Sequence, residues 1–226
     1  SHWRFILQAI LFGSIGTLVE TSELQRQSFN LAFQEVGLNW YWNTATYCRL
    51  ITEPGGMKRI KNYGENNLSE PEIKTIHALK EKHFAALVPE KLYLRPTVKE
   101  VLNYAKDLGL KLGFITTTSK SNIDLIKSGI RKQLNFDVFD LITTVSDVSH
   151  PKPHPEIYQF ALNKLRINSS DAIVIEDTLV NQRCASSAGL KCVLFPGEYA
   201  EIPPDNKYNT LAYNLIDKLE PELKNM

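Results

Sequence analysis

The spacing of apolar residues along this chain changes character near residue 95. Before that point, a short apolar run at residues 7–12 predicts a buried parallel strand. Across residues 20–89 the apolar positions instead recur at helical spacing. This block predicts one helix over residues 24–36 and a second over residues 71–87, with Ser69 as its N-cap.

Beyond Arg95 the pattern alternates between short apolar runs and amphipathic stretches. The apolar runs predict strands at 111–116, 141–144, 172–175 and 191–194, and the stretches predict helices at 98–108, 121–128, 155–165 and 181–188. This order is typical of an α/β fold, in which a parallel sheet carries helices on both faces. We therefore expect a core domain of residues 1–19 and 94–226. A helical cap domain of residues 20–93 is inserted after the first strand, and the tail from Pro203 should be a loop followed by a helix.

The composition indicates what class of protein this is but does not indicate its function. The chain has 226 residues, 43% of them hydrophobic, which suffices for a core domain and a smaller accessory one. The net charge of +1 gives no indication of nucleic-acid binding. Three cysteines without a Cys-x-x-Cys pair favour free thiols in a reducing compartment, so we expect a cytoplasmic protein. No apolar run reaches the roughly 18 residues of a membrane span, and Gln8 argues against a signal peptide over residues 5–18.

Four groups of polar residues follow predicted strands, where parallel sheets place their ligand sites. They are residues 13–17, the run Thr116–Ser119, Lys152 between two prolines, and Glu176 with Asp177. Each has a structural alternative when taken singly. The threonines can cap a helix, the lysine can be a solvated turn residue, and the acidic pair can begin the next helix.

The first of these groups contains no acidic side chain. Gly13 and Ile15 stand two positions apart, on the same side of an extended segment, and Ser14 lies between them. The first aspartate of the whole chain is Asp107, and the nearest later acids are Glu20 and Glu23. No carboxylate is therefore expected at the end of the first strand, and Ser14 has no adjacent base that would make it a nucleophile.

Taken together, the four groups resemble the signature of the haloacid dehalogenase superfamily, whose first motif is Asp-x-Asp-Gly-Thr-Leu. The chain is most similar to the β-phosphoglucomutase-like phosphatases and, among them, to the xylulose-1,5-bisphosphate phosphatases. The resemblance rests on segments spread over most of the chain: 20–21, 29–33, 37–42, 55–60, 94–99, 152–158 and 188–192. It implies a Rossmann-like, three-layer parallel-sheet core with a helical cap.

The resemblance also implies roles for individual residues. In the family, one aspartate attacks phosphorus, a second acts as acid and base, and Mg²⁺ bridges the phosphate and the acids. Gly13 and Ile15 occupy the places of those two aspartates. By the same resemblance, phosphate would be bound by Thr116, Thr117 and Lys152, the metal by Asp177 and Glu176, and the substrate by Glu20, Gln25 and Arg59 near the cap. Met57 replaces the lysine of the usual cap motif.

The residues and the resemblance lead to two functional hypotheses. The first is a hydrolase-family protein without phosphatase chemistry, a pseudo-phosphatase that keeps an anion pocket and binds a small phosphorylated ligand or a protein partner. Magnesium would then bind weakly or not at all, because one oxygen ligand is missing. The second is an active or weakly active Mg²⁺-dependent phosphatase that uses metal-bound water.

The sequence allows two alternatives each for Lys152 and for the aromatic residues of the cap. Lys152 either binds the anion or fills the vacated space by pairing with Asp177. The aromatic residues of the cap form either an exposed binding patch or ordinary core, namely Trp40, Tyr41, Trp42 and Tyr47.

Overall fold

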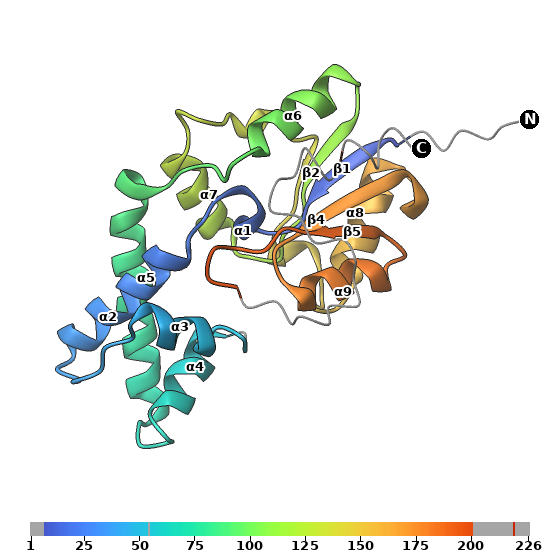
Figure 1. The fold of residues 1–226 in the computed structure, drawn as a ribbon. Coiled ribbons are helices and arrows are strands. Elements are labelled where there is room, and N and C mark those ends of the chain that lie inside the picture. Colours follow the sequence, from blue (N-terminus) through green and yellow to red (C-terminus); the bar gives the residue numbers. More distant parts are fainter. Residues whose placement is uncertain (1–6, 54, 201–218, 220–226) are drawn as a thin grey trace, which may run out of the picture. The chain divides into compact units, whose positions relative to one another are not determined.

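The computed structural model of the chain describes residues 7–53, 55–200 and 219 (Figure 1). These residues form two compact units. One comprises residues 7–20, 93–197 and 219, and the other comprises residues 21–53, 55–92 and 198–200. Each unit has its own apolar core. In the part of the chain that the structure describes, no helix is both long and apolar enough to cross a membrane.

The first unit is built on a five-stranded sheet in the order β3-β2-β1-β4-β5, and all of its strand pairs are parallel. The strands are β1 Ala9–Phe12, β2 Lys111–Phe114, β3 Leu141–Ile142, β4 Ala172–Glu176 and β5 Lys191–Leu194. Helices connect them, as expected where parallel strands need crossovers: α6 Val98–Asp107, α7 Lys120–Gly129, α8 Glu156–Leu165 and α9 Leu179–Ser187. The prediction of an α/β parallel-sheet fold is confirmed.

The central strand β1 is buried along its whole length because apolar side chains cover both of its faces. Leu11 belongs to the apolar cluster that includes residues of α8 and α9. Side chains alternate along a strand, so Phe12 points to the opposite face, where its ring packs edge-on against Phe139 at 6.3 Å. This burial fixes β1 in the centre of the sheet and sets where its final residue, and then Gly13, must lie.

The second unit is helical. It contains α2 Ser22–Glu35, α3 Thr44–Leu50, α4 Gly56–Tyr63 and α5 Glu70–Lys91. The helix predicted at 24–36 corresponds to α2, and Gly37 follows it with a positive φ of 78°. The helix predicted at 71–87 corresponds to α5. Its N-cap is Ser69, which forms a capping box with Glu72.

Of the four aromatic residues expected to form either core or an exposed patch, Trp42 and Tyr47 are core, Trp40 is partly buried and Tyr41 is exposed. Trp42 is 0% exposed and Tyr47 is 3% exposed, whereas Tyr41 is 67% exposed. The ring of Trp42 packs against Phe29 and Phe33 at centroid distances of 4.9 and 4.7 Å. The hypothesis of an exposed aromatic surface is therefore wrong for Trp42 and Tyr47, because both rings fill the space between the helices.

Some predicted boundaries and elements differ from the structure. The strand expected at 111–116 ends at Phe114, and the one expected at 141–144 ends at Ile142. Helices α3 and α4 were not predicted; they have only 7 and 8 residues, too few for a clear apolar period. A one-turn helix, α1 Ile15–Leu18, directly follows the end of β1. The predicted tail beyond Pro203 lies outside the described residues except for Leu219.

The capping box at Ser69 provides a stability test of the helical unit. The Ser69 hydroxyl accepts the backbone N–H of Glu72, so Ser69→Ala leaves that N–H without its partner. We expect a loss of about 1 kcal/mol in the free energy of unfolding, measured by urea denaturation. Ser187→Ala is the control, since that exposed hydroxyl only donates to a carbonyl of its own helix, and its effect should stay within about 0.5 kcal/mol. Equal effects of both changes would contradict the capping role.

Candidate functional site

The carboxyl ends of three neighbouring strands bring the candidate residues together. Phe12 of β1 is in register with Phe114 of β2 and with Ile175 of β4. The residues that follow these three positions therefore lie at the same edge of the sheet. They include Gly13 and Glu176, as the four-group pattern of the sequence predicted.

A buried ion pair joins two of the predicted site residues. The Lys152 ammonium lies 2.7 Å from Oε2 of Glu176, and these side chains are 7% and 0% exposed. The same ammonium donates to the backbone carbonyls of Gly13 and Ile115, the latter at 2.8 Å. The carboxylate that pairs with Lys152 is thus that of Glu176 and not that of Asp177, because Glu176 is the residue that points inward from the end of β4.

Tyr158 completes this cluster and was not among the predicted site residues. Its hydroxyl donates to Oε2 of Glu176 at 2.6 Å and lies 3.4 Å from the Lys152 ammonium. Burial, together with the charge of Glu176, holds the pKa of Tyr158 well above its usual value, so the hydroxyl keeps its proton. A tyrosine needs a polar partner for its hydroxyl when it is buried. This general rule was the sequence's only indication that Tyr158, near the start of a helix, could contact a charged residue.

The space beside Gly13 is filled by this cluster. A Cβ atom added to Gly13 would overlap the carboxyl group of Glu176 and the hydroxyl of Tyr158. The glycine is therefore required by the packing around it. Any larger residue at this position, including an aspartate, forces the Glu176 side chain to move.

A second acidic group lies beside the loop after β1. The hydroxyl of Ser14 donates to Oδ1 of Asp177 at 2.8 Å. A Cβ atom on Gly16 would overlap the Asp177 carboxyl, so this residue too is packed against a glycine. Burial, and then the nearby charge of Glu176, raises the pKa of Asp177 to about 6. The expectation that Ser14 has no adjacent base is therefore wrong, because the fold brings Asp177, distant in the sequence, within hydrogen-bond distance of its hydroxyl.

Arg95 bonds to the segment after β1 through Gly16 and to the segment after β5 through Phe195 and Pro196, and the sequence did not predict it as a site residue. The side chain is 8% exposed. It donates to the carbonyls of Gly16 and Phe195 at 2.8 Å each, and to that of Pro196. Burial lowers the pKa of its guanidinium. Its role is to satisfy backbone carbonyls that would otherwise be buried without donors.

The two predicted phosphate-binding threonines make hydrogen bonds within the loops of the core unit. Oγ1 of Thr116 accepts the backbone N–H of Thr118 at 3.1 Å, and Oγ1 of Thr117 accepts that of Lys152 at 3.3 Å. The N-cap of α7 is instead Ser119, whose hydroxyl accepts the N–H of Asn122. The threonines are thus not the helix cap, and each hydroxyl keeps its own proton to donate.

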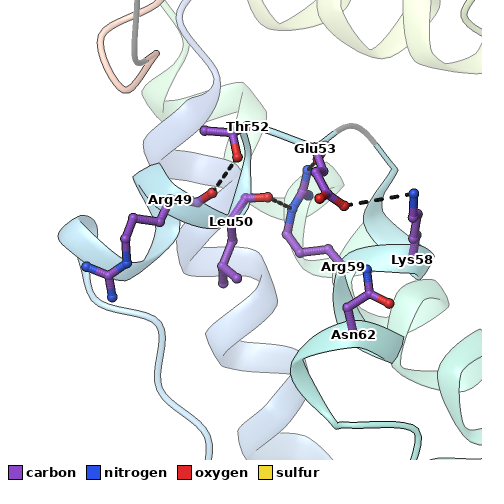
Figure 2. A pocket seen from close by; sticks show the side chains of 7 residues that line it. All are labelled: Arg49, Leu50, Thr52, Glu53, Lys58, Arg59 and Asn62. Carbon is purple, nitrogen blue, oxygen red and sulfur yellow. Dashed lines mark hydrogen bonds and ion pairs between the residues drawn. The ribbon is translucent and has the colours of Figure 1, made fainter. Parts of the chain in front are cut away.

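The three residues predicted to contact substrate near the cap fall in different units. Glu20 belongs to the core unit, while Gln25 lies on α2 and Arg59 on α4 of the helical unit. Figure 2 shows Arg59 beside a cavity of about 190 Å³ that is also lined by Arg49, Leu50, Thr52, Glu53, Lys58 and Asn62. Arg59 donates to the carbonyls of Leu50 and Glu53 at 3.3 and 3.1 Å. Burial lowers the pKa of its guanidinium.

Comparison with known proteins agrees with this architecture. The family model described as haloacid dehalogenase-like hydrolase matches residues 10–195. The chain belongs to the haloacid dehalogenase-like hydrolase family. The protein CbbY of Cereibacter sphaeroides is 36% identical over 198 residues, which cover 86% of each chain.

Solved structures give the same family assignment. CbbY from Rhodobacter sphaeroides in complex with phosphate is 33% identical and superposes with a TM-score of 0.77, covering 93% of this chain and 96% of that one. A mutant of the same protein in complex with xylulose-(1,5)bisphosphate gives a TM-score of 0.76 at 33% identity, covering 92% of this chain and 94% of that one. The chain thus shares its fold with CbbY over nearly the full length of both.

Members of this family generally use Mg²⁺, and the acidic groups present here fit that ion poorly. Oε2 of Glu176 already accepts from Lys152 and Tyr158, and Oδ1 of Asp177 accepts from Ser14. Oε1 of Glu176 is buried without a hydrogen-bond partner, and Asp177 has one further carboxyl oxygen, so most of the six ligands of Mg²⁺ would have to come from water, backbone carbonyls or phosphate. An ion on Glu176 would also lie close to the Lys152 ammonium, whose positive charge opposes it.

The packing beside Gly13 predicts the effect of enlarging it. Gly13→Ala places a methyl group against the carboxyl of Glu176, and we expect a loss of about 1–3 kcal/mol in the free energy of unfolding. Gly64→Ala is the control, because there the new methyl group would come no closer than 3.0 Å to its nearest neighbour, the edge of the Trp40 ring. Urea denaturation measures both. A Gly13→Ala protein as stable as the parent would show that the space is not filled.

The raised pKa of Asp177 predicts a pH dependence of stability. Because its pKa of about 6 exceeds the usual 3.8, the folded chain binds this proton more tightly than the unfolded chain. Its contribution to stability is thus favourable at low pH and is lost as the pH rises through 6. Asp177→Asn should therefore be more stabilising at pH 8 than at pH 4, by at most roughly 3 kcal/mol.

The measurement is urea denaturation of parent and Asp177→Asn across this pH range. Asp124→Asn serves as the control, since that exposed carboxylate pairs only with Lys120 on the surface of α7. A constant difference between parent and Asp177→Asn from pH 4 to 8 would contradict the raised pKa.

Proposed function

We propose that this chain is a catalytically inactive member of the haloacid dehalogenase-like hydrolase family, which binds a small phosphorylated ligand or inorganic anion without cleaving it. The observation that carries the proposal is the position of Glu176. Its carboxyl fills the space beside Gly13, where the resemblance would place the attacking aspartate. The space that an aspartate side chain would need at position 13 is thus occupied by Glu176.

No neighbouring side chain supplies the missing chemistry. Glu176 is 0% exposed, and one of its oxygens is held by two donors, so it does not reach a substrate. Ile15 offers a hydrocarbon where a proton donor is needed. The hydroxyl of Ser14 donates to Oδ1 of Asp177, whose pKa of about 6 leaves it largely ionised near pH 7, but a serine hydroxyl does not replace the attacking carboxylate of the family. Removing one essential catalytic group commonly lowers the rate by several powers of ten. Here both position 13 and position 15 lack the aspartate that the family uses.

Donors for an anion remain near the strand ends. Thr116 and Thr117 keep hydroxyl protons, and Lys152 supplies a cation whose present partner is Glu176. An anion must therefore compete with an internal carboxylate for Lys152, which predicts weak binding. The crystal complexes of CbbY with phosphate and with xylulose-(1,5)bisphosphate support a small phosphorylated molecule as the ligand class.

The helical unit contributes a second set of positive groups. Arg49, Lys58 and Arg59 line one cavity, and the carboxylate of Glu53 lies 3.9 Å from the Lys58 ammonium (Figure 2). An excess of cations around a cavity favours a ligand that carries negative charge. We propose that Arg59 contributes to recognition of such a ligand, while the contacts expected of Gln25 and Glu20 stay predictions.

One observation favours a second function, a weakly active Mg²⁺-dependent phosphatase. Oε1 of Glu176 is buried and has no hydrogen-bond partner, which is a costly state for a carboxylate oxygen. A metal ion held there and on Asp177 would relieve it and could activate water. This function requires Mg²⁺-dependent turnover that Asp177→Asn abolishes.

A phosphatase assay separates the two functions. We expect the parent chain to hydrolyse neither xylulose-1,5-bisphosphate nor p-nitrophenyl phosphate above background, with Mg²⁺ or with EDTA, because the nucleophile is absent. The double variant Gly13→Asp, Ile15→Asp tests whether the scaffold still positions substrate, and Ile15→Asp alone is its control. Parent turnover that needs Mg²⁺ and disappears in Asp177→Asn would overturn the proposal, whereas turnover that persists in Asp177→Asn would reveal a contaminating enzyme.

Anion binding is measured separately, by thermal unfolding with inorganic phosphate in the presence of EDTA. We expect phosphate to raise the melting temperature of the parent and to have less effect on Lys152→Ala and Thr117→Val. The second variant matters because Lys152→Ala also leaves Glu176 without its buried partner. Lys120→Ala, at an exposed surface pair, is the control and should respond as the parent does. Equal shifts in all four proteins would show that phosphate binds elsewhere.

A further inference from the structure

Three side chains with metal-ligating atoms gather where the chain enters α8, apart from the cluster around Glu176. His150, His154 and Glu156 each present one ligand atom, and these atoms lie within 4.8 Å of one another. Nδ1 of His150 is 3.1 Å from Oε2 of Glu156. Two ligands of a tetrahedral Zn²⁺ lie roughly 3.3 Å apart, since each bond is about 2.0–2.1 Å long. The His150–Glu156 pair already has this spacing, and a small rotation of the exposed rings would bring the third ligand atom to it.

We propose that His150, His154 and Glu156 bind one divalent transition-metal ion of the Zn²⁺ class. Two imidazoles and one carboxylate are a ligand set that suits zinc, nickel and copper, with water completing the coordination. Magnesium prefers oxygen ligands and gains little from two imidazoles. The site thus takes a different ion from the one generally used by the haloacid dehalogenase-like hydrolases, and it does not depend on the proposed function above.

The carboxylate of this site is already fixed in place. Glu156 accepts the backbone N–H groups of Ser149 and His150 at 3.0 and 2.8 Å. These two hydrogen bonds fix the orientation of the carboxyl group at the entry to α8. The ion would therefore bind to an oriented anion and would not have to order it.

The two histidines are close to a binding arrangement. Their rings are stacked with centroids 4.8 Å apart. Nδ1 of His154 accepts the backbone N–H of Glu156 at 3.1 Å, which fixes the orientation of this ring beside Glu156. The His150 side chain is 69% exposed, so its rotation can bring the ligand atoms to bonding distance without moving the core.

The position of the site links it to Lys152. His150 and His154 lie on either side of this lysine in the chain, and the backbone N–H of Lys152 donates to Thr117. An ion shared by the two histidines would tie together both ends of the segment that carries Lys152. Metal binding should therefore stabilise the loop that presents this lysine to Glu176.

Titration calorimetry with ZnCl₂ on the metal-free, full-length chain tests the proposal. We expect one Zn²⁺ per chain, an increase in melting temperature on binding, and no displacement by millimolar Mg²⁺. His150→Gln and His154→Gln should each weaken binding by about tenfold or more. His83→Gln is the matched control, because this histidine pairs with Glu35 at 2.7 Å without a third ligand nearby in the described part of the chain.

His2→Gln and His77→Gln complete the set of controls, so that each imidazole of the chain is tested. Because His150 and His154 are exposed, their variants should fold as the parent does, and melting curves without metal check this. Binding of less than one ion per chain, or an affinity that neither variant lowers, would overturn the proposal. So would an equal loss of affinity in the His83→Gln control.

Discussion

The structure of the site depends on one buried interaction, the ion pair between Lys152 and Glu176. The ammonium and carboxylate lie 2.7 Å apart at the carboxyl ends of the strands, with almost no exposure to water. Removing one partner of such a pair commonly costs about 3–5 kcal/mol, because the other charge stays buried. The pair also determines the neighbouring residue. With the Glu176 carboxyl beside β1, position 13 has room only for glycine.

The ion pair lies on a scaffold that keeps the arrangement of the family. The five-stranded sheet aligns the ends of β1, β2 and β4, and Arg95 donates to the carbonyl of Gly16 after β1 and to those of Phe195 and Pro196 after β5. Membership of the haloacid dehalogenase-like hydrolase family follows from this scaffold and from the match over residues 10–195. Activity is decided by the side chains at the strand ends, and in this chain they bond chiefly to one another.

The sequence predicted the fold more completely than the site. Strands and long helices have clear apolar periods, so the parallel sheet, α2 and the Ser69 cap of α5 could be anticipated, whereas the short helices α3 and α4 could not. The absence of a carboxylate after β1 was also visible. The sequence did not show that Lys152 pairs with Glu176 and not with Asp177. That pairing depends on which of these two neighbouring side chains points inward at the end of β4. The hydroxyl of Tyr158 was missed for the same reason, since only packing places it on Glu176.

A crystal structure of the chain grown with both Mg²⁺ and phosphate tests the central claim most directly, because it offers Glu176 its alternative partner. We expect the Glu176 carboxyl to remain within hydrogen-bond distance of Lys152 Nζ and the Tyr158 hydroxyl, with no ion between it and Asp177. A structure in which Glu176 has turned to ligate Mg²⁺, leaving Lys152 on the phosphate and open space beside Gly13, would contradict it.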